Sequence, residues 1–198
     1  QHKRTNTEWL QFSTNEVNLK PDESLTLTYE MNPPEDVDDK GSYWGVIMVE
    51  EAEDLDTSDV ERGVKVKSLV RYAIQIIGSF DNESVKELNI ADVQMKNGTE
   101  GEFLQVSIDN LGNYMLKPIV ILELYNEDGD QVSRSEMPYR KIYPGYCKTF
   151  EIPLEGVPKG SYNGVLVADC GDENLYGLNL EVTVGNTVGD EPQTVDEE

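Results

Sequence analysis

The heptapeptide Lys40-Gly41-Ser42-Tyr43-Trp44-Gly45-Val46 recurs later in the chain as Lys159-Gly160-Ser161-Tyr162-Asn163-Gly164-Val165. Each copy follows a turn that contains proline, Lys20-Pro21-Asp22-Glu23 before the first and Tyr143-Pro144-Gly145-Tyr146 before the second. An alternating strand lies between the turn and the heptapeptide in both cases. Similarity at a domain-sized spacing predicts two copies of one structural module.

Most of the second copy consists of short alternating segments separated by turn residues. A period of two between apolar and polar residues is typical of half-buried strands, and no segment shows a convincing helical period. Residues 126–130 place a glycine where a hairpin loop needs a positive φ, and residues 110–113 form a second turn. The predicted strands are 88–95, 103–109, 116–125, 131–136, 148–154, 162–169 and 175–184.

This number of short strands in about a hundred residues is typical of an immunoglobulin-like sandwich. We therefore predict an all-β protein made of two tandem immunoglobulin-like β-sandwiches. Tyr43 and Tyr162 follow a Gly-Ser pair where the sixth strand of such a sandwich begins. A tyrosine at this position buries its ring while its hydroxyl bonds back to the preceding loop, which pins the corner.

The first copy is shorter than the second and lacks its early strands. Its recognisable strands match the later half of a sandwich, and such a half leaves an apolar face uncovered and a strand edge unpaired. Either the chain was trimmed before Gln1, which is the simpler explanation, or a neighbouring molecule supplies the missing strands. The strands predicted for this copy are 9–12, 24–31, 43–50 and 64–77.

Three segments follow from these patterns. Residues 1–82 are predicted to form a partial immunoglobulin-like domain, and residues 87–185 a complete one with seven strands. Residues 186–198 are acidic and contain no aromatic residue, so we expect a disordered tail.

The strongly acidic composition excludes some classes of partner. The chain has 16 basic and 39 acidic residues, a formal net charge of -23. Such a surface repels nucleic acid and anionic lipid, so we expect neither as a partner. No apolar run approaches the length that crosses a bilayer, so membrane insertion is not expected either.

The sequence contains few of the residues and motifs that catalysis requires. His2 is the only histidine, so no Ser-His-Asp or Cys-His arrangement can form within one domain. Cys147 and Cys170 lack the spacing of metal ligands, and both a disulfide and two free thiols remain open. The acidic loops 36–39 and 50–56 lack the positional pattern of a calcium loop and are better read as solvated loops. We predict a protein that is not an enzyme and has no cofactor.

The predicted strand 64–77 is the most suggestive segment for binding. Its apolar row is longer than a half-sandwich buries easily. One interpretation is core packing against the missing strands, and the other is an edge that pairs with the strand of a protein partner. The candidate partner-binding residues are Lys65, Lys67, Arg71, Tyr72, Ile74 and Ile76.

Several motifs together resemble those of tandem immunoglobulin-like proteins of bacterial cell envelopes. The chain is similar to PapD-like periplasmic chaperones and to the two-domain surface proteins that partner WxL-type proteins. The motifs are Trp9, the turn Leu19-Lys20-Pro21-Asp22-Glu23-Ser24, Lys40-Gly41-Ser42-Tyr43, Ile108-Asp109-Asn110-Leu111-Gly112 and Tyr143-Pro144-Gly145.

The resemblance implies a location in the bacterial periplasm, on the cell surface or outside the cell. A pilus chaperone would clamp the terminal carboxylate of a subunit with basic residues, and on the last strand of the first domain Lys65, Lys67 and Arg71 are the candidates. We expect a non-catalytic protein that acts in protein–protein binding or assembly, as a chaperone-like or adhesion-type module, with self-association through the incomplete first domain as one form.

The alternative function is that of a carbohydrate-binding accessory module in an extracellular system. This alternative predicts aromatic side chains exposed on one sheet face or loop. The residues in question are Trp44, Tyr114, Tyr139 and Tyr146.

Overall fold

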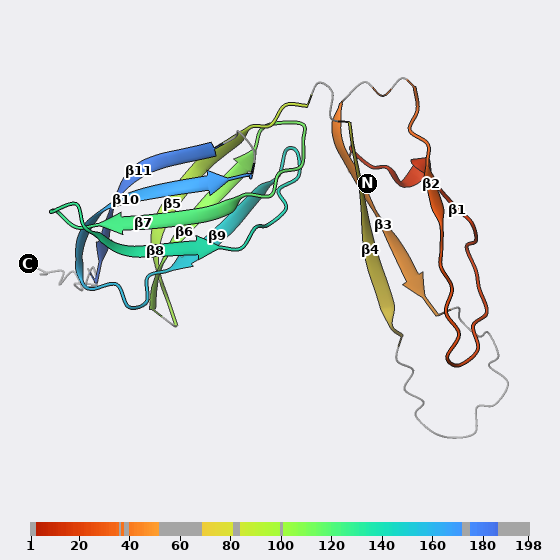
Figure 1. The fold of residues 1–198 in the computed structure, drawn as a ribbon, viewed down its shortest axis with the longest axis horizontal. Coiled ribbons are helices and arrows are strands. Elements are labelled where there is room, and N and C mark those ends of the chain that lie inside the picture. The colour runs from red at the N-terminus through yellow and green to blue at the C-terminus, as the bar shows by residue number, and fades with distance from the viewer. Residues whose placement is uncertain are drawn as a thin grey trace, which may run out of the picture. The chain divides into compact units, whose positions relative to one another are not determined.

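The computed structural model describes residues 3–35, 37, 40–51, 69–80, 84–99, 101–171 and 175–185. The chain divides into two compact units, Gln1–Glu83 and Ser84–Glu198. Apart from one turn of 3-10 helix, every regular element in the described ranges is a β-strand, which confirms the all-β prediction (Figure 1). The described part of the chain has no helix that is long and apolar enough to cross a bilayer.

The second unit is a two-layer β-sandwich. One sheet has the strand order β5-β6-β9 and the other the order β11-β10-β7-β8, with antiparallel neighbours throughout. Figure 1 shows one sheet lying in front of the other. The strands are β5 (Leu88–Gly98), β6 (Gly101–Asn110), β7 (Ile119–Tyr125), β8 (Gln131–Met137), β9 (Cys147–Pro153), β10 (Gly160–Asp169) and β11 (Leu175–Val184).

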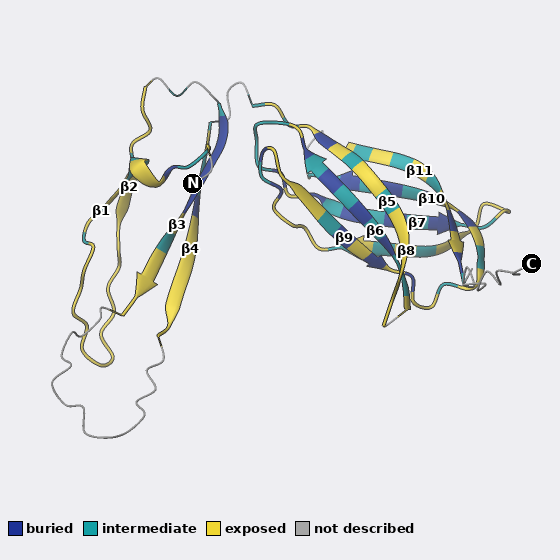
Figure 2. Ribbon diagram, turned by 180° about the vertical axis from the view of Figure 1, so that it is seen from behind, coloured by how far each residue is buried: buried dark blue, intermediate teal, exposed yellow. Residues whose placement is uncertain are grey.

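The core of this unit lies between its two sheets. Side chains along β6 and β7 alternate between buried and partly exposed positions (Figure 2). Val106, Leu122, Phe150 and Leu166 are at most 2% exposed. Full burial of a side chain of this size contributes about 1.5–3 kcal/mol, so the aliphatic rows supply the main stabilising term.

Both predicted turns of the second unit are present. Gly129 has a φ of 83°, and the side chain of Asn126 accepts the Asp130 N–H at 2.8 Å. At the other turn the side chain of Asn110 is buried and accepts the Gly112 N–H at 3.0 Å. Polar turn residues thus hydrogen-bond their own loop, as short side chains of this type do.

The tyrosine corner that the sequence predicts is formed in the second unit. Tyr162 is 9% exposed, and its hydroxyl donates to the Pro158 carbonyl oxygen at 2.7 Å. The ring therefore packs in the core while the hydroxyl holds the loop that enters β10. In the first unit the ring of Tyr43 is also buried, and its centroid lies 4.5 Å from that of Trp9.

The first unit contains two small sheets, one of β1 with β2 and one of β3 with β4. At the start of β3, Trp9, Tyr43 and Phe80 form an aromatic cluster. This cluster joins the two sheets, because Trp9 precedes β1 and the other two lie in β3 and β4. The elements are η1 (Thr7–Trp9), β1 (Leu10–Phe12), β2 (Tyr29–Met31), β3 (Gly41–Glu50) and β4 (Arg71–Phe80).

The first unit is less regular than the sequence predicts. The predicted strand 24–31 is a strand only at Tyr29–Met31, the three residues that pair with β1. Of the predicted strand 64–77, residues 64–68 lie outside the described ranges, and β4 runs from Arg71 to Phe80.

Candidate functional site

One end of the β3–β4 hairpin exposes many apolar side chains. We call Val46–Glu50 of β3 together with Arg71–Gln75 of β4, which lie opposite each other, the open end. Tyr72 is 63% exposed and Ile74 51%. On β3, Val46, Met48 and Val49 are also exposed. Figure 2 shows β3 changing from buried at its start to exposed at its end.

The corresponding hairpin of the second unit is covered at the same place. Gly41 lies opposite Phe80 and Gly160 opposite Val184, so the two hairpins share one register. By this register Tyr72 and Ile74 correspond to Tyr176 and Leu178, which are partly buried and pack against the core. The face that carries Tyr72 and Ile74 therefore corresponds to a face that is covered in the second unit.

The same end also leaves main-chain groups of β3 directed away from β4. Trp44 donates its N–H to the Arg4 carbonyl oxygen at 3.0 Å and accepts the Asn6 N–H at 3.4 Å. Peptide groups point to alternate edges of an antiparallel strand, so those of Val46 and Met48 point to the same edge as those of Trp44. Within the described residues, no strand pairs with this edge after Trp44.

The six sequence-predicted binding residues fall into four groups. Lys65 and Lys67 lie outside the described residues. Tyr72 and Ile74 lie together on one exposed face, while Ile76 is only 6% exposed and belongs to the interior of the first unit.

Arg71 lies at the end of the hairpin, where it pairs with Glu50. Both side chains of this ion pair are about half exposed, so it adds at most about 1 kcal/mol. Sequence reasoning missed the β3 half of the open end. The sequence does contain an indication of this half, the unbroken apolar run Val46-Ile47-Met48-Val49. This run has no polar residue on either face of the strand.

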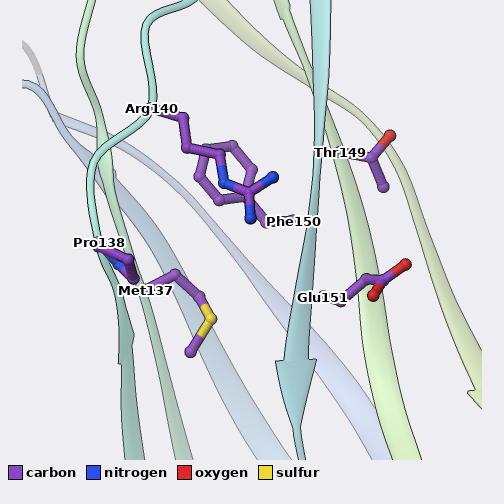
Figure 3. Close-up of a pocket in the computed structure, with 6 residues that line it drawn as sticks. All are labelled: Met137, Pro138, Arg140, Thr149, Phe150 and Glu151. Atoms are coloured by element: carbon purple, nitrogen blue, oxygen red, sulfur yellow. The ribbon is translucent and has the colours of Figure 1, made fainter. Parts of the chain in front are cut away.

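The second unit has a small cavity of about 260 Å³ where the sandwich is open between β8 and β9. Figure 3 shows the guanidinium of Arg140 in front of the Phe150 ring, with 5.8 Å between Arg140 Cζ and the ring centroid. Thr149 and Glu151 point to the other side of β9, as strand alternation requires. The cavity combines one cation with a buried ring and brings no catalytic pair together.

The four aromatic residues considered for carbohydrate binding do not share one environment. Trp44 is only 9% exposed, so its ring is not available for stacking. Tyr114 packs against the sandwich core and faces the Lys86 ammonium at 5.3 Å. Tyr139 and Tyr146 are exposed in the connection between β8 and β9.

The described part of the chain contains few side chains that suggest metal binding or thiol chemistry. No cluster of three or more His, Cys, Asp or Glu side chains that could hold a metal ion occurs among the described residues. Cys147 and Cys170 are not joined in a disulfide. No family model, no curated protein and no solved structure matches the chain.

Proposed function

We propose that the protein is a non-catalytic binding or assembly protein that recognises a protein partner through the open end of its first unit. A single observation carries this proposal. Tyr72 and Ile74 are 63% and 51% exposed, whereas their counterparts Tyr176 and Leu178 pack against a core. Contiguous apolar surface of this kind usually marks an interaction site.

The magnitude of apolar burial indicates what kind of contact is needed. Full burial of one such side chain contributes about 1.5–3 kcal/mol, and half of that remains to be gained for each half-exposed residue. The open end then offers about 5 kcal/mol, while association costs about 4–15 kcal/mol. Main-chain hydrogen bonds to an added strand supply the difference, which favours strand addition over a purely apolar contact.

We propose that both units are immunoglobulin-like modules. Supporting this are the sheet orders β5-β6-β9 and β11-β10-β7-β8 and the Tyr162 hydroxyl bond to Pro158. The proposed location is the periplasm or surface of a bacterium, or the medium outside it, and it rests on the resemblance of the sequence motifs to those of envelope proteins. Recovery of the native protein from the cytoplasmic fraction would count against this location.

The proposed binding surface is tested by substituting Ile74→Lys and comparing the proteins that the two forms retain from envelope extract. Val132→Lys on β8 is the matched control, because it places the same charge on an exposed strand residue of the second unit. We expect Ile74→Lys to lose partners that both the native chain and Val132→Lys retain. An unchanged set of partners, in a variant whose tryptophan fluorescence is native, would refute the surface.

A further inference from the structure

The complete unit shows which edge of the first unit lacks a strand. In the second unit β11 is an edge strand, and β7 covers the other side of β10. Since β3 and β4 share the register of β10 and β11, the outer edge of β4 corresponds to an edge that is free even in a complete sandwich. The edge of β3 corresponds to one that a complete sandwich covers.

We propose that the first unit accepts a strand of another polypeptide along the edge of β3, at Val46–Glu50 and antiparallel to it. This inference rests on the proposed function and specifies its contact. It places the added strand beside β3, whereas the sequence alone directs attention to the 64–77 strand. The main-chain groups of Val46 and Met48 are the donors and acceptors for the added strand.

The second unit also indicates the side chains that fit. On the inner face of β10, Leu166 lies opposite Leu122 of β7 and Ala168 opposite Val120. All four side chains are at most 1% exposed. The first-unit counterparts of Leu166 and Ala168 are Ile47 and Val49, so the accepted strand carries large aliphatic residues opposite these two.

The residue between those two aliphatic positions lies opposite Met48 and faces outward, because side chains alternate along a strand. The accepted strand therefore has an alternating pattern of aliphatic and variable residues. Its length is limited at one end, since Arg4–Asn6 already bonds to Trp44. The contact spans about five residues, so we expect modest affinity and rapid exchange.

The net charge of the chain indicates whether the strand accepted at the β3 edge comes from a different protein or from a second copy of this chain. The chain carries a formal charge of -23, so two copies repel each other. Glu51 adds negative charge at the far end of the edge, beyond the ion pair of Glu50 with Arg71. A neutral or basic strand of a different protein therefore fits the site better than a second copy of this chain.

The test uses a peptide with the sequence of residues 117–126, which contains β7, as a surrogate for the unidentified partner. Met48 and Ala73 lie directly opposite each other, and the N–H groups of both point away from the hairpin. Proline at such a position is tolerated in an edge strand but removes one donor. Met48→Pro thus blocks the β3 edge, and Ala73→Pro is its matched control on the β4 edge.

We expect the full-length chain to bind the peptide. Met48→Pro should raise the dissociation constant for the peptide about tenfold or more. Ala73→Pro should change it less than about twofold. Weakening by Ala73→Pro alone, equal weakening by both variants, or no binding to the native chain would each overturn the proposal. A peptide of the same length in which serine replaces Val120 and Leu122 should not bind.

Amide exchange in the native chain gives a second measurement that needs no variant. We expect the amides of Val46 and Met48 to exchange rapidly without peptide and slowly with it, while the Ala73 amide is unaffected. Protection of Val46 and Met48 in the free monomer, or only in a self-associated form, would overturn the proposal. If Met48→Pro has no effect on binding but Ile74→Lys abolishes it, strand acceptance fails and the proposed function stands.

Discussion

The two units carry the same hairpin in two different settings. In both, a Gly-Ser-Tyr sequence opens the first strand, and ten residue pairs follow without a register shift. Even a cross-strand hydroxyl pair recurs, as Ser42 with Ser79 and Ser161 with Thr183. In the described part of the chain, only the second hairpin has a further paired strand, β7, and a facing sheet of three strands. The hairpin register is thus local, whereas burial of its inner face depends on what packs against it.

The largest expected effect comes from truncating equivalent residues of the two hairpins. Leu166 is fully buried, and its counterpart Ile47 is half-buried. We expect Leu166→Ala to lower the free energy of unfolding of the second unit by about 3 kcal/mol, and Ile47→Ala to lower that of the first by less than half as much.

Chemical denaturation separates the two effects, because both tryptophans, Trp9 and Trp44, lie in the first unit. Tryptophan fluorescence therefore follows the first unit, and far-ultraviolet circular dichroism follows mainly the larger second one. Equal losses for the two variants would mean that the inner face of β3 is as well covered as that of β10.

An intermediate effect is expected at the turn that closes the second unit. A Cβ atom on Gly112 would lie 2.1 Å from the Val85 carbonyl oxygen, so Gly112→Ala forces the two segments apart. We expect a loss of about 2 kcal/mol, measured by thermal unfolding.

The matched control for this turn is Gly129→Ala. Gly129 has a φ of 83° but no atom within 4 Å of a built Cβ, so only conformational strain remains. That strain is about 1 kcal/mol. If both alanines lowered the melting temperature equally, close packing of this turn on Val85 would not be the reason for glycine.

A smaller effect is expected from removing the hydroxyl of the tyrosine corner. Tyr162→Phe keeps the buried ring but loses the 2.7 Å bond to the Pro158 carbonyl oxygen. A bond of this kind contributes about 1 kcal/mol, and we expect the second unit to lose that amount in urea denaturation. A variant as stable as the native chain would show that ring packing alone holds the corner.

Much of the second unit follows from its sequence because each strand has its partners within the chain. The alternation of residues 175–184 predicts β11 to the residue. Two differences of three residues remain: β5 continues to Gly98, and β7 begins only at Ile119, because Pro118 has no N–H to donate to a ladder. Residues 24–28 show the reverse case. Their alternating pattern is as clear, yet they form no strand, and β1, which pairs with Tyr29–Met31, ends at Phe12.

The candidate site follows from the sequence only in part, for the same physical reason. Apolar alternation at Tyr72, Ile74 and Ile76 predicts one shared face, but it does not distinguish exposed residues from buried ones. Ile76 is buried while Ile74 is exposed, because the aromatic cluster and Asn6 cover only the start of the hairpin. The role of the β3 edge became evident only from the position of β7 beside β10.

The smallest expected effect concerns the outer face of the sheet that contains each hairpin. These outer faces differ in polarity between the two units. Beside β10, the outer face of β7 and β8 carries a network in which Glu123 accepts bonds from the Tyr125 hydroxyl and from Arg134. In the first unit, the outer face of β3 instead exposes Val46 and Met48. The network should therefore be detectable by titration of the Tyr125 hydroxyl.

The hydrogen bond to Glu123, followed by burial and the negative charge of that carboxylate, raises the pKa of Tyr125 above its ordinary value of 10.0. A raised pKa means that the fold favours the neutral phenol. Its contribution to stability is thus fully present below pH 10.0 and is lost as the pH rises through the raised value. Glu123→Gln should return the pKa toward 10.0, because the amide carries no charge and is a weaker acceptor. Phenolate absorbance, taken as the difference from Tyr125→Phe, measures the shift, and an unchanged midpoint in Glu123→Gln would show that the carboxylate is not its cause.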